Sequence, residues 1–431
     1  MIGSRAVVAL VVALGATILL GAVPGTVQSA ATTSAAVGCP QQITPPPPVD
    51  LSEVPAPGSP TPLPMSVPNR PVGGPLMGVC GLVLPVNAPL PPAGISAASW
   101  LVADADSGEV LAARSPHARH RPASTIKLLT ALLAAEQLPL NRVVVATQAD
   151  ADQEGSKAGL GPGGRYTVRQ LLTGLLLVSG NDTAHALAVQ LGGVAETVEQ
   201  MNELAAGLGA LDTRAATPSG LDGPGMSTSA YDLALVFREV LNRPILTELL
   251  STRQVNFPGF GERPGFVLSN DNKLLRNYPG ALGGKTGFTD DARHTYVGAA
   301  QRDGRPLVVV LMRGEQRPIR MWEQGARLLD YGFALPESAE PVGELVDGPP
   351  SEDEPVPTPP PSSEAPPTLI EPPASGSGAV ADSSNEGKTS NEDTIAGQIA
   401  VAAAALVVLV GVLWQQLRRT RGDDEADDEA G

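Results

Sequence analysis

The sequence of 431 residues predicts a mixed α+β domain with a disordered arm on either side. Two β-hairpin patterns, near residues 100–113 and 295–312, enclose a series of helical patterns. Strands at both ends of a domain with helices between them favour one shared sheet. Gly (47) and Pro (43) together exceed a fifth of the chain, whereas aromatic residues are 3%. This composition indicates a folded core joined to extended segments.

The first hairpin is expected from residues 100–105 and 109–113, because two apolar β-rich runs flank the turn Asp106-Ser107-Gly108. The second is expected from residues 295–301 and 307–312, where β-branched residues flank an Asp303-Gly304 turn. Helical apolar spacing with few breakers predicts helices over residues 124–138, 171–178 and 183–191. Thr228 or Ser229 is expected to cap a helix that runs to about Asn242 and is stopped by Pro244, and residues 318–331 form the last helix.

The net charge of −16 is concentrated near the C-terminus. Residues 336–394 hold 13 acidic side chains and one basic one, Lys388, while residues 1–335 hold 26 acidic and 25 basic ones. A nearly neutral body argues against nucleic-acid binding. Residues 336–394 are also too polar and too poor in aliphatic side chains to pack, so they are expected to form an acidic Pro/Ser linker.

Both ends of the chain have patterns typical of membrane-targeting or membrane-spanning segments. Arg5 and the apolar run 6–23 predict a signal peptide over residues 1–31, although an uncleaved anchor fits the same run. Residues 395–414 are apolar and long enough for a transmembrane helix. Arg418, Arg419 and Arg421 place the tail of residues 415–431 in the cytoplasm. The expected location is therefore the plasma membrane, single-pass, with the body on the extracytoplasmic, cell-wall side.

The two cysteines fit export. Cys39 and Cys80 fall in or near residues 32–94, which are crowded with proline and predict an extended arm. In an oxidising compartment the two cysteines can pair, although Cys39 also follows a weak lipoprotein-like pattern. Neither cysteine is placed like a catalytic group.

Three short motifs carry chemistry. Ser124-Thr125-Ile126-Lys127 puts a serine and a lysine on one helix face, where the lysine can take the hydroxyl proton. Taken alone, this motif is better explained as a helix cap followed by a surface lysine. Ser179-Gly180-Asn181 equally fits a turn, and Lys285-Thr286-Gly287, on an expected edge strand, equally fits a glycine-rich loop. In this order, however, the three motifs are the signature of penicillin-interacting serine enzymes.

The sequence resembles the serine-type D-alanyl-D-alanine carboxypeptidases, the low-molecular-weight penicillin-binding proteins. The resemblance spans about residues 100–335, and its strongest stretches are 121–130 (RPASTIKLLT), 175–184 (LLLVSGNDTA), 219–225 (SGLDGPG) running into 227–233 (STSAYDL), and 284–290 (GKTGFTD). It implies a penicillin-binding, β-lactamase-like fold over residues 95–335: an antiparallel sheet flanked by helices, with a helical subdomain. It also implies hydrolysis of the terminal D-Ala-D-Ala bond of peptidoglycan stem peptides, inhibition by β-lactams, and no cofactor or metal.

The same resemblance implies a role for each motif residue. Ser124 would be the nucleophile, Lys127 the general base, and Ser179 the group that passes a proton to the leaving amine. Substrate would be held by the side chains of Asn181, Lys285 and Thr286 and by the strand at Gly287. The backbone N–H groups of Ser124 and Phe288 would form the oxyanion hole. An additional arginine often contacts the substrate carboxylate in this family; Arg313 and Arg320 are both candidates.

The sequence gives less support to other functions. None of the four histidines has the spacing of a zinc-binding His-Glu-x-x-His motif, and no Gly-x-Ser-x-Gly elbow is present. His294 fits either the cleft or simply the start of a strand. A β-lactamase remains an alternative, but we find no Glu-x-x-Leu-Asn segment to activate the deacylating water. The other alternative is a non-catalytic wall-binding protein of the same fold.

Overall fold

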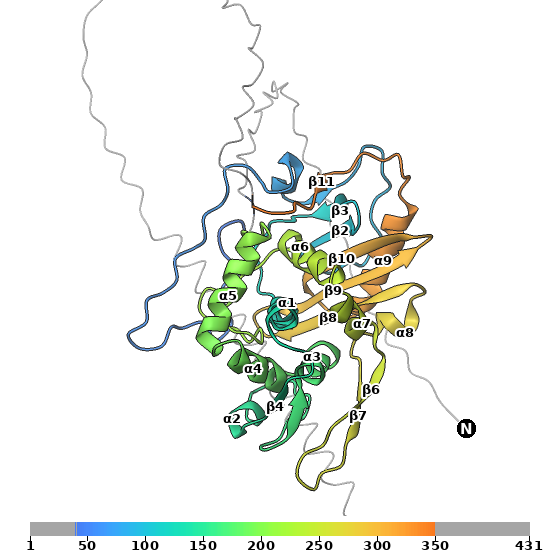
Figure 1. The fold of residues 1–431 in the computed structure, drawn as a ribbon. Coiled ribbons are helices and arrows are strands. Elements are labelled where there is room, and N and C mark those ends of the chain that lie inside the picture. The colour runs from blue at the N-terminus through green and yellow to red at the C-terminus, as the bar shows by residue number, and fades with distance from the viewer. Residues whose placement is uncertain (1–38, 40, 350–431) are drawn as a thin grey trace, which may run out of the picture. The chain divides into compact units, whose positions relative to one another are not determined.

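The computed structural model describes residue 39 and residues 41–349. Its central element is one antiparallel sheet (Figure 1). The strand order is β1-β3-β2-β10-β9-β8, and β11 also pairs with β3. The strands are β1 (Leu82–Val83), β2 (Ser99–Asp104), β3 (Glu109–Arg114), β8 (Ala281–Thr289), β9 (Arg293–Arg302), β10 (Arg305–Gly314) and β11 (Gly343–Glu344). Because β2 pairs with β10, with Val102 opposite Val309, the two predicted hairpins do share one sheet.

Both faces of the sheet are covered. Successive side chains of a strand point to opposite faces, and β2 is buried at every position, so each face needs a layer against it. On one face Trp100, Val102 and Val309 pack against α9 (Met321–Ala334). On the other, Leu101 and Val310 belong to a larger core that includes α6 (Ala230–Leu241). The expected sheet flanked by helices is confirmed.

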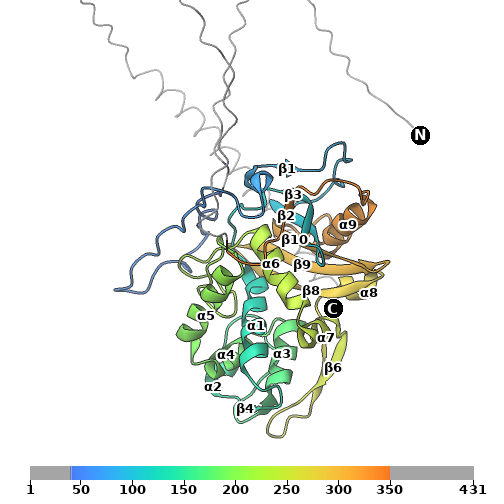
Figure 2. The same ribbon diagram turned by 45° about the horizontal axis from the view of Figure 1, so that its top comes forward.

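A helical subdomain lies on the α6 side of the sheet, with α1 at its centre (Figure 2). Its helices and two small two-stranded sheets are α1 (Lys127–Gln137), α2 (Gln148–Ala151), α3 (Val168–Leu177), α4 (Asn181–Gln190), α5 (Val194–Gly207), α7 (Pro244–Ser251), β4 (Val143–Val145) with β5 (Arg165–Thr167), and β6 (Gln254–Phe257) with β7 (Phe266–Ser269). The short elements η1 (Pro75–Gly78), η2 (Ala123–Ile126) and α8 (Leu274–Asn277) lie outside it.

The five predicted helices are confirmed, and two features differ from the prediction. Ser229 caps α6 by accepting a hydrogen bond from the backbone N–H of Asp232. Pro244 does not simply stop that helix, because it is also the first residue of α7, where its missing N–H costs nothing. Helix α5 was not predicted, although it begins directly after Gly192-Gly193.

The packed chain extends beyond the expected domain of residues 95–335 on both sides. Residues 41–80, expected to be an extended arm, lie against residues 117–121, and Cys39 and Cys80 form a disulfide with Cα atoms 5.5 Å apart. The expectation that nothing after Leu335 packs is also wrong. Val342 and Leu345 are buried, and β11 adds to the edge of β3, so the start of the segment is apolar enough to pack.

The expected signal peptide and the expected membrane span at 395–414 lie outside the described residues. Within residues 41–349, no helix is both long and apolar enough to cross a membrane.

Candidate active site

The first motif places Ser124 beside Lys127. Ser124 lies in the 3-10 turn η2, and Lys127 is the first residue of α1. Side chains three residues apart eclipse one another in a 3-10 turn, and the Nζ of Lys127 donates a hydrogen bond to the Oγ of Ser124 at 2.8 Å. Thr295 of β9 anchors the turn by donating to the carbonyl of Pro122 at 2.8 Å. The serine is therefore held between the sheet and the helical subdomain.

The amine of Lys127 is fully buried and has two further acceptors. One is the Oδ1 of Asn181, at 2.7 Å, and the other is the carbonyl of Ser219. Burial first, and then the positive charge of Lys285, lowers the pKa of Lys127 well below its usual value, while Asp182 opposes the shift. A neutral amine keeps two N–H donors and one lone pair. In that form Asn181 and Ser219 accept the two N–H donors, so the contact between Nζ and Ser124 Oγ reverses direction and the serine hydroxyl donates to the lone pair.

The second motif lies in the turn between α3 and α4. Ser179 has a left-handed backbone conformation, with φ of 61°, and its buried hydroxyl has no hydrogen-bond partner among the described residues. Asn181 begins α4, and its Nδ2 donates to the carbonyl of Glu154 at 2.6 Å. The free hydroxyl of Ser179 is thus available to a ligand, whereas the amide of Asn181 is fixed on both sides.

The third motif lies on β8, the edge strand expected from the sequence. A Cβ on Gly287 would stand 2.9 Å from the backbone nitrogen of Ser124 and 2.3 Å from the hydroxyl of Thr295, so only glycine lets the strand pass this close. Lys285 is buried and donates to the carbonyl of Thr286 at 2.7 Å. Burial lowers the pKa of Lys285 to about 7, against the opposing charge of Asp271.

The three motifs meet at an open cleft of about 1180 Å³. The predicted residues that line it are Ser124, Ser179, Thr286, Gly287, Phe288, His294 and Arg320. Of the two arginine candidates, Arg320 therefore lies at the cleft, while Arg313 is not in its lining and donates to the carbonyl of Asp291 at 2.7 Å. Lys127 and Lys285 lie behind the lining and act on it through hydrogen bonds and charge.

Comparison with known proteins agrees with this geometry. A family model described as D-alanyl-D-alanine carboxypeptidase matches residues 86–316, more than half of the chain. The chain belongs to this carboxypeptidase family.

Its relatives span several bacteria. D-alanyl-D-alanine carboxypeptidase DacB2 of Mycobacterium tuberculosis is 50% identical over 254 residues, which are 58% of this chain and 86% of that protein. DacF of Bacillus subtilis is 32% identical over 56% of this chain and 63% of its own length. Among solved structures, a D-alanyl-D-alanine carboxypeptidase of M. tuberculosis superposes with a TM-score of 0.58 at 48% identity, covering 61% of this chain and all of that one. The Streptomyces K15 DD-transpeptidase gives 0.55 at 28% identity, covering 57% of this chain and all of that one.

Two residues of this carboxypeptidase-family site were not given roles from the sequence. The buried carboxylate of Asp182 accepts hydrogen bonds from the backbone N–H groups of Ala158, Gly159 and Leu160, at 2.7 to 2.9 Å, and so fixes the loop facing Ser179. Ser219 contributes its carbonyl to Lys127. Both lie in stretches that carried the family resemblance, but a carbonyl acceptor has no signal of its own in a sequence.

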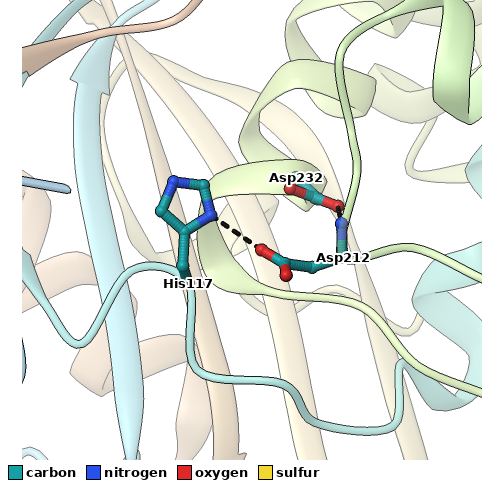
Figure 3. Close-up of side chains that lie close together, drawn as sticks. All are labelled: His117, Asp212 and Asp232. Carbon is teal, nitrogen blue, oxygen red and sulfur yellow. Dashed lines mark hydrogen bonds and ion pairs between the residues drawn. The ribbon is translucent and has the colours of Figure 1, made fainter. Parts of the chain in front are cut away.

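A second cluster of ionisable groups lies away from the cleft (Figure 3). His117, Asp212 and Asp232 have ligand atoms within 4.8 Å of one another, which is close enough to hold a metal. The surrounding contacts fit an ion-pair cluster better. The two ring nitrogens of His117 contact Asp212 Oδ2 at 2.7 Å and the carbonyl of Val72 at 2.9 Å, and Arg119 donates to Asp212 Oδ1 at 2.8 Å. A ring between two acceptors needs both N–H groups, which leaves no lone pair for a metal.

Proposed function

We propose that this chain is a serine D-Ala-D-Ala carboxypeptidase that removes the terminal D-alanine from peptidoglycan stem peptides. The family membership and the intact motifs support this function. The observation that carries it is the Lys127–Ser124 hydrogen bond at 2.8 Å, made by a buried amine whose pKa is lowered. Buried lysines of this kind act as general bases.

In the acylation step, the neutral amine of Lys127 takes the proton of the Ser124 hydroxyl as Oγ attacks the carbonyl carbon of the D-Ala-D-Ala bond. The developing oxyanion accepts hydrogen bonds from the backbone N–H groups of Ser124 and Phe288, where one donor is typically worth about 3–4 kcal/mol of barrier. The C–N bond then breaks, and Ser179 passes a proton to the departing amine. D-Alanine leaves, and an ester on Ser124 remains.

Substrate binding and deacylation complete the cycle. Thr286 lines the cleft and Lys285 lies directly behind it, so together they favour the terminal carboxylate of the substrate. Asn181 donates one Nδ2–H to Glu154 and has a second one for the substrate amide, and Arg320, which lines the cleft, is the candidate for a second carboxylate contact. Water then attacks the ester carbonyl and releases the shortened peptide and the free Ser124 hydroxyl.

Release of D-alanine tests this function. The protein is incubated with a peptide ending in Lys-D-Ala-D-Ala, and free D-alanine is measured for the wild type and for Ser124→Ala. We expect release by the wild type alone. Rapid turnover of penicillin without D-alanine release would instead indicate a β-lactamase. The absence of both activities would favour a non-catalytic wall-binding protein of the same fold.

We also propose that the enzyme works outside the plasma membrane, anchored by residues 395–414 after export directed by residues 1–31. The two apolar runs and the disulfide between Cys39 and Cys80 support this location. The acidic Pro/Ser segment before residue 395 would let the catalytic domain reach the wall. Fractionation of cells that express the full chain, or a chain ending at residue 349, tests the anchor: only the full chain should stay with membranes.

A further inference from the structure

The disulfide-closed segment of residues 41–80, here called the strap, is held by three basic residues on a short stretch that leads to Ser124. His117, Arg119 and Arg121 alternate along that stretch, and each donates to backbone carbonyls of the strap. The acceptors are Val72 for His117, Ile43, Met65 and Ser66 for Arg119, and Pro46 for Arg121. Twelve residues of the strap are proline, so many of its carbonyls have no neighbouring N–H groups to bond. Multidentate arginines supply those donors.

One part of the strap, residues 46–53, connects two separate segments of the catalytic body. Glu53 forms a two-pronged ion pair with Arg121, and its Oε2 accepts from Arg121 Nη2 at 2.7 Å. Asp291 accepts from the backbone N–H of Val49 and, at 3.3 Å, from the hydroxyl of Ser52. The Nε of Arg121 also lies 4.0 Å from the Oδ2 of Asp291. Arg121 and Asp291 are nearly fully buried, so these contacts are shielded from solvent.

The two connected segments carry the proposed oxyanion donors. Arg121 lies three residues before Ser124, and Asp291 lies three residues after Phe288. The approach between these segments is tight, since even a Cβ on Gly287 would press on the nitrogen of Ser124. Small displacements of such donors are costly, because a misplacement of about 1 Å can slow catalysis about a hundredfold.

We propose that the strap is a positioning element of the active site: Glu53 acts through Arg121, and Val49 and Ser52 act through Asp291, to set the spacing between the backbone N–H groups of Ser124 and Phe288. The proposal rests on the proposed function, because it concerns the acylation of Ser124. It makes Glu53, in a proline-rich segment more than seventy residues before the nucleophile, a positioning residue of the enzyme.

Acylation kinetics with a fluorescent penicillin test this role in the detergent-solubilised full chain. The measurement separates the acylation rate constant k2 from the dissociation constant of the noncovalent complex. Glu53→Ala and Glu53→Gln should lower k2 by about 10- to 100-fold while changing the dissociation constant by less than about threefold. Glu53→Asp, which can still pair with Arg121, should recover k2 to within about threefold of the wild type.

Arg238→Ala is the matched control. Arg238 also holds backbone carbonyls of a terminal segment, those of Leu345 and Val346 at 2.9 and 2.7 Å, but on α6 and away from the cleft. This variant should lower the melting temperature and leave k2 within about twofold of the wild type. If the Glu53 variants likewise lose only thermal stability, the strap is merely structural and the proposal is overturned. A wild-type chain that is not acylated at all would instead overturn the proposed function.

Discussion

Lys127 Nζ lies 2.8 Å from Ser124 Oγ, and the two residues are the start of α1 and the turn before it. In the proposed mechanism no further group is needed to orient the base, because the Oδ1 of Asn181 and the carbonyl of Ser219 already accept hydrogen bonds from the amine. Burial lowers the pKa of Lys127, so the amine can serve as a base without a histidine beside it.

Replacing the base should therefore stop acylation without unfolding the protein. For Lys127→Ala we expect penicillin acylation to fall by about a hundredfold to ten-thousandfold, since no other group can take the serine proton. Stopped-flow kinetics give the rate, and circular dichroism checks the fold. A variant acylated at nearly the wild-type rate would mean that the lysine is only structural.

The charge of Lys285 should appear in the pH profile. Lys127 must be neutral to act, so acylation falls in acid as Lys127 gains a proton. Burial is the main cause of its lowered pKa, but the neighbouring positive charge of Lys285 lowers it further. In Lys285→Gln that repulsion is absent, so the acid limb of k2 against pH should move to higher pH. An unmoved limb, or one shifted to lower pH, would show that the two amines are not coupled.

The sequence predicted the positions of the three motifs better than it predicted the segments that hold them in place. The three motifs, the two hairpins and the sheet-edge position of Lys285 are local patterns, and the structure has each of them. The way Arg119 and Arg121 hold residues 41–80 could not be predicted, because the carbonyls that they bond lie about fifty to seventy-five residues away in the sequence. A carbonyl is present at every residue, so only the folded chain shows which ones are used.

The C-terminal limit of the domain was missed for a related reason. The average composition of residues 336–394 is polar and acidic, so it does not reveal that the start of the segment contains the apolar residues Val342 and Leu345. Both side chains are buried, and the carbonyl of Glu344 accepts a hydrogen bond from the hydroxyl of Tyr231 at 2.6 Å.

Two truncations test this limit. A chain ending at Leu335 should lose about 3 kcal/mol or more of its free energy of unfolding relative to a chain ending at residue 349, because two buried aliphatic side chains are removed. Urea denaturation of both proteins measures the difference. Equal stability of the two chains would show that residues 336–349 add nothing to the fold.

His117 should make the stability of the strap depend on pH. Burial opposes its protonation, but the hydrogen bond and charge of Asp212 outweigh burial and raise the pKa of His117 above 6.5. Its stabilising contribution is therefore complete below pH 6.5 and is lost as the pH rises through the folded-state pKa. The melting-temperature advantage of the wild type over His117→Gln should be larger at pH 6 than at pH 9. An advantage that grows with pH would contradict a protonated His117.

The site of the covalent penicillin adduct tests most directly whether Ser124 is the nucleophile. The protein is incubated with benzylpenicillin, digested, and its peptides are analysed by tandem mass spectrometry beside Ser124→Ala. We expect one penicilloyl group on Ser124 in the wild type and none in the variant. An adduct on another serine, or labelling that persists in Ser124→Ala, would show that Ser124 is not the nucleophile.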